Sequence, residues 1–119
     1  MNLLDLMEKK NFLVLGDCSN KEKKASEIYD KLKYLNKNVS FIYKEGNIDD
    51  IPYDIEVLDI CINYHLSTKL IQNTTKHIGA AIIQPGAENE ELFNLLKEKG
   101  IPYIEGCVLV GAALMKGKM

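Results

Sequence analysis

The stretch Phe12-Leu13-Val14-Leu15-Gly16-Asp17-Cys18-Ser19-Asn20 decides the fold class of this chain. It begins with four consecutive apolar residues, a run typical of a parallel strand that is buried on both faces. It ends in a glycine and a short polar loop. Ser19 and Glu22, three residues later, match a capping box and predict a helix from about Asn20 to about Asn36. A buried strand followed at once by a helix indicates an α/β fold.

The same alternation continues on both sides of this stretch. We expect further strands at 39–43, 57–62, 80–83 and 102–105, with helices at 2–9, at 66–78 and after the turn at 84–86, and with Gly79 as the C-terminal cap of helix 66–78. Short connections between these elements favour parallel strands with helices on both faces. The sequence therefore predicts a Rossmann-like, doubly wound, three-layer domain with a five-stranded, mostly parallel sheet in the order 2-1-3-4-5. We expect all 119 residues to form this one domain.

Composition excludes several classes of partner. A formal net charge of −2 gives no reason to expect binding to nucleic acid or to an anionic membrane surface. No apolar stretch approaches the roughly 18 residues of a membrane span, and Asp5 and Glu8 interrupt the N-terminal segment that a signal peptide would need. We therefore expect a cytoplasmic protein. The three cysteines are odd in number and widely separated, which argues against a disulfide framework and against a metal site.

The predicted strand order places a ligand crevice between strands 1 and 3, because the chain reverses its direction there. Two polar segments would face each other across this switch point, Gly16-Asp17-Cys18-Ser19-Asn20 and Asn63-Tyr64-His65. The first has a single glycine, so it matches neither the GxGxxG loop of NAD-binding domains nor the GxxxxGK[ST] loop of nucleoside triphosphatases. A short polar loop that enters a helix N-terminus is instead suited to bind an anion through backbone N–H groups.

Lysines crowd the first turn of the predicted helix. Lys21, Lys23 and Lys24 are each unfavourable to the helix dipole by about 0.3–1 kcal/mol. A bound polyanion would offset this. The alternative interpretation is a set of solvated lysines in a chain whose fifteen basic residues are all lysine. We include Lys23 and Lys24 in the predicted site.

The turn Gln84-Pro85-Gly86 closes the predicted fourth strand. Pro85 presets φ and Gly86 tolerates a positive φ, so both residues suit a turn. Gln84 is then a polar side chain at the carboxyl end of a central strand, which is the edge where open α/β sheets bind ligands.

The thiols and histidines indicate no catalytic set. Cys18 lies where a helix N-terminus lowers a thiol pKa, which makes it a candidate reactive thiol, although a small turn residue is the simpler interpretation. Cys61 is expected to be a buried apolar residue inside strand 3. His65 has no Ser, Cys or carboxylate spaced to pair with it, and His77 is expected at a helix end. We assign no catalytic residue and expect binding rather than catalysis.

In these features the chain resembles the small bacterial and archaeal CoA-binding proteins. Their Rossmann-like domain is shared with the CoA-binding part of succinyl-CoA synthetase α chains and of ADP-forming acyl-CoA synthetases. The likeness spans about residues 10–110 and includes the order of the elements. Three segments carry it: Val14-Leu15-Gly16-Asp17 with Ser19-Asn20-Lys21-Glu22-Lys23; Ile82-Ile83-Gln84-Pro85-Gly86-Ala87-Glu88; and Glu105-Gly106-Cys107-Val108-Leu109-Val110. Many family members have prolines in the first loop, where this chain has Asp17-Cys18.

The resemblance implies that CoA or an acyl-CoA is the ligand, and it assigns the residues by position. The loop 16–20 with Lys23 would hold the diphosphate. Tyr43 and Lys44 would lie near the adenosine and its 3′-phosphate. The segments 63–65 and 84–86 would line the far wall of the crevice. The histidine-phosphorylation domain and ligase partner of the synthetases have no counterpart here, so their reaction is not implied.

Three other functions stay open, and the first two share this fold. A receiver-like signalling domain needs a phosphoacceptor aspartate at the end of strand 3, where this chain has residues 63–65 after a mid-strand Asp59. An NAD-type redox sensor is disfavoured by the single glycine of the first loop. An interaction module would use the apolar segment 108–115, which we expect to contact a second copy of the chain or a protein partner.

Overall fold

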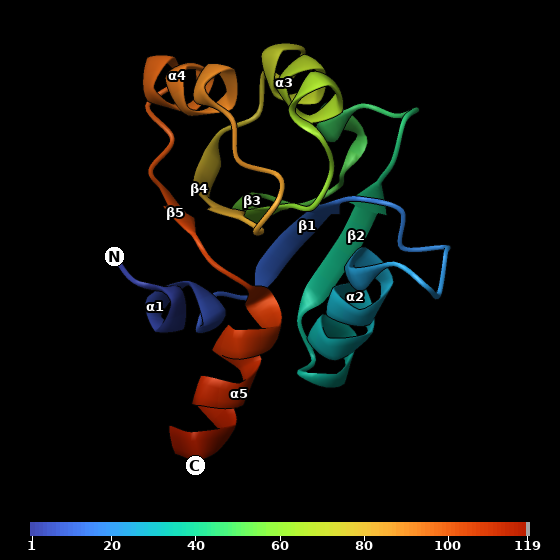
Figure 1. Cartoon of the computed structure of the whole chain (residues 1–119), viewed down its shortest axis with the longest axis vertical. Helices are drawn as coiled ribbons and strands as arrows, with labels where there is room; N and C mark the ends of the chain where they lie inside the picture. Colours follow the sequence, from blue (N-terminus) through green and yellow to red (C-terminus); the bar gives the residue numbers. More distant parts are fainter. Residues whose placement is uncertain (119) are drawn as a thin grey trace.

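A computed structural model describes residues 1–118 of the chain, and its centre is a five-stranded parallel sheet (Figure 1). The strands lie in the order β2-β1-β3-β4-β5, so the predicted fold class and strand order are confirmed. The strand bounds are β1 Asn11–Leu15, β2 Asn38–Ile42, β3 Ile55–Ile60, β4 Ile78–Ile83 and β5 Tyr103–Glu105.

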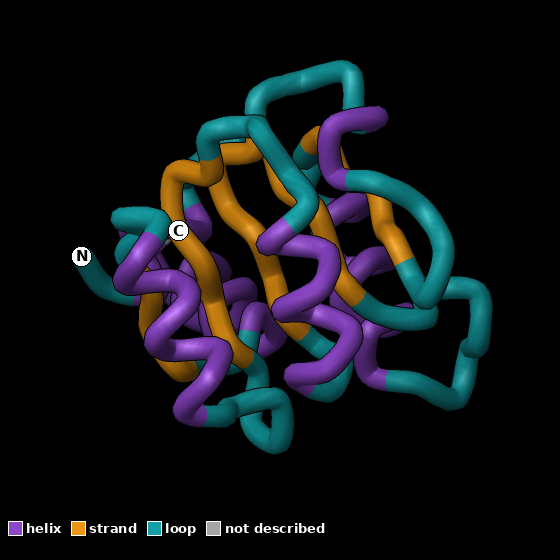
Figure 2. Tube along the Cα trace, turned by 90° about the horizontal axis from the view of Figure 1, so that it is seen from above, coloured by secondary structure: helices purple, strands orange, loops and turns teal. Residues whose placement is uncertain are grey.

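Helices cover both faces of the sheet. The bounds are α1 Leu3–Met7, α2 Lys24–Tyr34, α3 Tyr64–Gln72, α4 Glu90–Glu98 and α5 Val108–Lys118, with a 3-10 helix, η1 Ile48–Asp50, between β2 and β3. Helices α1, α2 and α5 lie on one side of the sheet and α3 and α4 on the other (Figure 1). The view from above shows the strands running side by side within this helical cover (Figure 2).

Alternate residues of the central strands supply the two cores. Phe12 and Val14 pack in the core under α1, α2 and α5, whereas Leu13 and Leu15 pack in the core under α3 and α4. All four are fully buried, and each contributes about 1.5–3 kcal/mol by leaving water. A run of four apolar residues is therefore needed, because both faces of β1 are covered.

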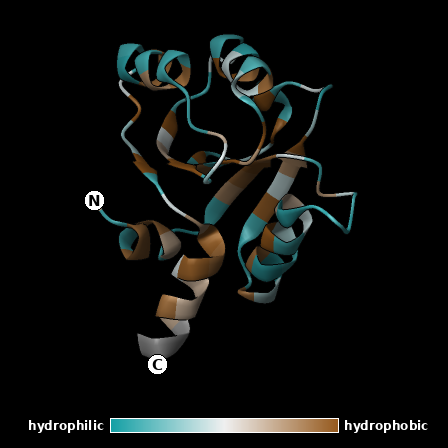
Figure 3. Ribbon diagram, in the orientation of Figure 1, coloured by the Kyte–Doolittle hydropathy of each residue, from teal (hydrophilic) through white to brown (hydrophobic). Residues whose placement is uncertain are grey.

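The apolar C-terminal segment forms helix α5, which is apolar along most of its length (Figure 3). Its residues Val108 and Ala112 are buried in the core that α1 and α2 share. Gly111 allows α5 to pack closely against α1, because a Cβ at this position would lie 2.7 Å from Cγ of Met7. Val110 and Leu114 are 55% and 52% exposed, so only part of the predicted interaction surface is used within the chain.

Helix α2 begins later than predicted. It starts at Lys24 with Lys23 as an N-cap that makes no side-chain cap bond, so the predicted capping box and the start near Asn20 are wrong. The predicted cap residues hold the preceding loop instead. The Ser19 hydroxyl donates to Oδ1 of Asp17 at 2.6 Å, and Oδ1 of Asn20 accepts from the N–H of Glu22. Serine and asparagine side chains compete for nearby polar groups in this way.

The boundary between α3 and β4 also differs from the prediction. Helix α3 ends at Gln72, and β4 begins at Ile78, so Gly79 is a strand residue and not a helix cap. A Cβ at Gly79 would lie 2.6 Å from the carbonyl oxygen of Glu56 on β3, which explains a glycine within the strand. His77 precedes β4 and does not end a helix. Strand β3 runs over Ile55–Ile60, two residues earlier than predicted at each end.

Candidate ligand site at the switch point

A cavity of about 330 Å³ opens at the carboxyl ends of the neighbouring strands β1 and β3, where the segments that follow them lead to helices on opposite faces of the sheet. This is the crevice that the strand order predicts. Loops after β1, β2, β3 and β4 contribute to its wall, so four separate segments meet there. Seven of the predicted site residues line it: Asp17, Lys23, Lys24, Tyr43, Asn63, Gln84 and Pro85.

Four side chains that the sequence did not assign also line the cavity. Ala25, Cys61, Ile62 and Leu66 form its apolar part. Cys61 lies just after β3 and is half-buried, so its prediction as a buried residue inside a strand is wrong. Its place directly after a buried strand was the signal that could have identified it.

The rest of the first loop supports the cavity from outside its lining. Gly16 is buried against α2, and a Cβ there would lie 2.7 Å from Cβ of Ala25 and 3.1 Å from Cβ of Cys61. Only glycine lets the loop pass between the helix and β3. Ser19 and Asn20 stabilise the loop: the Ser19 hydroxyl donates to the Asp17 carboxylate, and the Asn20 side chain accepts from the N–H of Glu22.

The thiol of Cys18 is not available to a ligand. Its side chain is 4% exposed, and its Sγ donates to the carbonyl oxygen of Ala25 at 3.3 Å. Burial, reinforced by the carboxylate of Asp59, raises the pKa of this thiol to about 12. The structure therefore favours the turn-residue interpretation of Cys18 over the reactive-thiol interpretation.

The remaining predicted residues flank the cavity. Lys44 adopts a φ of 61° and borders a neighbouring hollow of about 130 Å³ that shares Leu66 with the main cavity. Tyr64 and His65 open helix α3, with their ring centroids 4.0 Å apart. Gly86 adopts a φ of 97° in the turn after β4, and its N–H donates to Oε2 of Glu88.

The positive side of the cavity is the start of helix α2. Lys23 and Lys24 line the cavity, and among residues 1–118 no side chain caps this helix N-terminus. Lys21 lies outside the cavity and pairs with Asp30 at 3.5 Å, with both side chains largely exposed. The start of this 11-residue helix places backbone N–H groups without a side-chain cap beside two cationic side chains, an arrangement suited to phosphate groups.

A buried polar group lies behind the opposite wall. The carboxylate of Asp59 is fully buried in β3. Its Oδ1 accepts from Nε2 of Gln84 at 2.8 Å, and its Oδ2 accepts from Sγ of Cys61 at 3.4 Å. Desolvation raises the pKa of Asp59 to about 7, although both hydrogen bonds oppose the shift. Burial and the same carboxylate raise the pKa of the Cys61 thiol.

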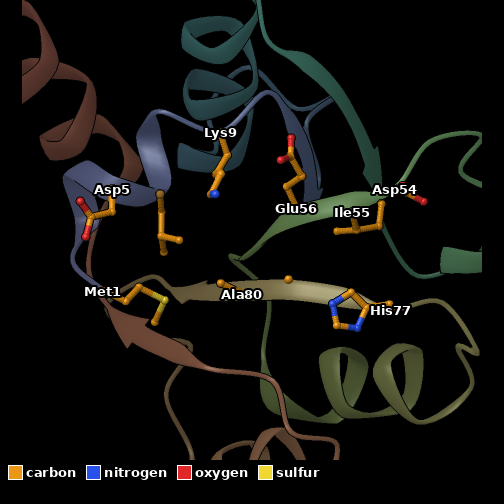
Figure 4. Close-up of a pocket in the computed structure, with 10 residues that line it drawn as sticks. Met1, Asp5, Lys9, Asp54, Ile55, Glu56, His77 and Ala80 are labelled. Atoms are coloured by element: carbon orange, nitrogen blue, oxygen red, sulfur yellow. The ribbon is translucent and has the colours of Figure 1, made fainter.

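A larger cavity of about 600 Å³ lies at the opposite, amino-terminal edge of the strands (Figure 4). Asp5, Lys9, Glu56 and His77 are among its lining residues. Oε1 of Glu56 is already occupied by the N–H groups of Lys10 and Asn11, at 3.0 and 2.9 Å. Open α/β sheets bind ligands at the carboxyl ends of their strands, which is the edge where the smaller cavity lies.

Residues 1–118 contain neither a metal-binding cluster nor a membrane-spanning helix. No group of three or more His, Cys, Asp or Glu side chains is arranged to hold a metal ion. No helix among these residues combines the length and the apolar character that a bilayer crossing requires.

Most of the chain matches a known protein family. The family described as "CoA binding domain" matches residues 10–113, which is most of the chain. The chain belongs to this family. The resemblance inferred from the first loop, the Gln84 turn and the segment around Cys107 is thereby confirmed. No curated protein matches the chain.

Solved structures share the fold of this CoA-binding domain protein. A Thermus thermophilus protein, cell-free ID.343, superposes with a TM-score of 0.80 at 19% identity, over 97% of this chain and 99% of the other. Prb, a protein redesigned for binding, gives a TM-score of 0.82 at 15% identity, over 100% of this chain and 95% of the other. A conserved hypothetical protein from Pyrococcus furiosus gives a TM-score of 0.67 at 20% identity, over 86% of this chain and 98% of the other.

Proposed function

We propose that this protein binds coenzyme A or an acyl-CoA in the cavity at the switch point and has no catalytic activity of its own. The observation that carries the proposal is the cavity wall formed by Lys23, Lys24 and the uncapped start of α2. It lies at the edge of the sheet where the CoA-binding domain family, to which the chain belongs, would bind its ligand. We also propose that the whole chain acts as one binding unit in the cytoplasm.

The charge distribution supports a polyanionic ligand. The diphosphate would accept hydrogen bonds from the backbone N–H groups at the start of α2 and charge-assisted hydrogen bonds from Lys23 and Lys24. Asp17 also lines the cavity, but its Oδ1 accepts from the Ser19 hydroxyl at 2.6 Å. That bond ties the Asp17 carboxylate to its own loop, which reduces its repulsion of a phosphate.

The remaining walls suit the two ends of the ligand. Tyr43 lines the cavity, and Lys44 follows it beside the neighbouring hollow, so the adenosine and its 3′-phosphate would lie over the end of β2. The pantetheine arm would run over Ile62 and Leu66 toward Gln84. Apolar side chains there suit the methyl and methylene groups of the arm.

Neither alternative function gains support from a particular contact. A receiver domain needs an exposed phosphoacceptor at the end of β3, but Asp59 is fully buried in the strand and hydrogen-bonded to Gln84. The first loop contains only Gly16, whereas an NAD site of the usual kind needs three glycines.

The test is calorimetric titration of CoA into wild type, Lys23→Ala and Lys24→Ala at two salt concentrations. We expect each substitution to weaken CoA binding about threefold to tenfold at low salt and to reduce the loss of affinity on adding salt. Lys9→Ala, at the opposite edge of the sheet, is the matched control and should bind CoA like wild type. Unchanged affinity in both site variants, or no binding by wild type, would overturn the proposal.

A further inference from the structure

Gln84 is buried, yet one of its polar atoms has no partner. The side chain is 4% exposed and lines the cavity at the switch point. Its Nε2 donates to Oδ1 of Asp59 at 2.8 Å. Its carbonyl oxygen Oε1 is buried and receives no hydrogen bond from residues 1–118. A buried acceptor without a donor is unfavourable, and a ligand that supplies the donor removes this deficit.

The orientation of the amide follows from the chemistry of Asp59. An ionised carboxylate only accepts hydrogen bonds, so Gln84 must turn its NH₂ group toward Asp59 and its oxygen away. A protonated Asp59 has an O–H that can donate to Oε1 instead, which would satisfy the oxygen from within the protein. The charge of Asp59 therefore controls whether Oε1 is free to accept from a ligand.

We propose that Gln84, oriented by ionised Asp59, presents Oε1 as the acceptor for an amide N–H of the pantetheine arm. This inference rests on the proposed function, since it names the part of CoA that binds at this wall. Asp59 is a positioning residue in this account, because it lies behind Gln84 and does not line the cavity.

Among Asp59 and the thiols that surround it, Asp59 is the group whose charge changes near neutral pH. Cys61 donates its thiol to Oδ2 of Asp59, and Cys18 and Cys107 are neighbouring thiols that interact with Cys61. Cys18 also interacts with Asp59 across the start of α2. Burial keeps the thiols of Cys18 and Cys61 protonated near neutral pH, since it raises both of their pKa values.

Two ligands separate the arm from the nucleotide. CoA and the terminal methyl ester of 3′-phosphoadenosine 5′-diphosphate carry the same adenosine, diphosphate diester and 3′-phosphate, and therefore the same charge at each pH, but only CoA has the arm. We compare their dissociation constants by calorimetry at pH 6 and pH 8 at fixed ionic strength. The quantity of interest is the affinity gained from the arm, which is the ratio of the two constants.

For wild type we expect this ratio to be about threefold to tenfold larger at pH 8 than at pH 6, since one hydrogen bond is gained. Asp59→Asn cannot ionise and should show the same ratio at both pH values. Gln84→Met keeps the length of the side chain but lacks the acceptor, and should lose about threefold to tenfold in CoA affinity with no change for the armless nucleotide. Gln72→Met, on the exposed end of α3, is the matched control and should match wild type.

The outcomes separate the two proposals. Failure of wild type to bind either ligand would contradict the proposed function, and this inference with it. Binding of CoA with an arm contribution that is the same at both pH values in wild type would overturn the inference and leave the proposed function intact. The wild-type comparison needs no variant, so misfolding of Gln84→Met would not prevent this decision.

Discussion

The carboxylate of Asp59 is fully buried, and its hydrogen-bond partners among residues 1–118 are one amide N–H and one thiol. Ordinary carboxyls keep their charge because water or a cation stabilises it, and neither group here carries a positive charge. Desolvation therefore dominates and raises the pKa of Asp59 to about 7. Burial of the charged Asp59 side chain therefore destabilises the folded protein.

Asp59→Asn should accordingly stabilise the unliganded protein at neutral pH. The pKa of Asp59 in the folded protein lies above the ordinary value of 3.8. Below about pH 4 the carboxyl is protonated in both the folded and the unfolded protein, so its burial carries no charge penalty. The penalty for burying the charged form grows as pH rises to about 7. We expect the stability gain of Asp59→Asn to grow over that window and to reach a few kcal/mol at most. Thermal unfolding from pH 4 to pH 8 measures it. Asp50→Asn, at an exposed position, is the control, and equal shifts at every pH would contradict the prediction.

Sequence alone could not reveal the pair of Asp59 and Gln84. The two residues are 25 positions apart, and their contact depends on the parallel register of β3 and β4, in which Ile60 pairs with Ile83. Gln84 was predicted to line the crevice because of its turn. Its buried partner carries no local signal, since an aspartate inside an apolar strand does not show which side chain meets it.

At the scale of elements, Asp49 fixes the connection between α3 and β4. Its Oδ1 accepts from the Thr74 hydroxyl at 2.5 Å and from the N–H of Thr75 at 2.9 Å, and its Oδ2 accepts from the Thr75 hydroxyl at 2.8 Å. These bonds tie η1 to a turn that lies 25 residues later. The Lys76 ammonium donates to the carbonyl oxygens of Ile51 and Tyr53 and so binds the same turn to the segment that follows η1.

Asp49→Asn should destabilise the protein at neutral pH and lose its effect in acid. The hydrogen bonds from Thr74 and Thr75 lower the pKa of Asp49 to about 2. A lowered folded pKa contributes stability above about pH 3.8, and this contribution disappears as pH falls toward 2. We expect a melting temperature a few degrees below wild type at pH 7 and convergence of the two near pH 2 to 3. A constant difference across this range would contradict the role given to Asp49.

Element boundaries were predicted less well than element types, and each difference has its own physical reason. The polar loop before α2 resembles a capping box, but Ser19 bonds to Asp17, and the helix starts at Lys24. The pattern that ends in Ile78 and Gly79 fits a helix and its cap. The contacts with Asp49 stop α3 earlier, and Ile78 pairs with Ile55 in the sheet. A hydrogen bond within the loop thus accompanies the later start of α2, whereas long-range contacts set the boundary between α3 and β4.

For the molecule as a whole, the topology was predictable because β1, β3 and β4 are short, mainly apolar strands that are each followed by an α-helix. Right-handed connections then leave few arrangements, and the order β2-β1-β3-β4-β5 places the crevice after β1 and β3. Seven of the predicted site residues meet at that crevice. The apolar lining of Ala25, Ile62 and Leu66 was missed because such residues look like core in a sequence.

We propose that this crevice binds CoA in preference to other nucleotides. The most direct measurement is a thermal-shift comparison of CoA, acetyl-CoA, NAD and AMP at matched concentrations, since a ligand that binds the folded state raises the melting temperature as its concentration exceeds its dissociation constant. We predict that CoA and acetyl-CoA raise the melting temperature and that NAD and AMP raise it far less. A higher melting temperature with NAD and an unchanged one with CoA would contradict the proposed binding of CoA.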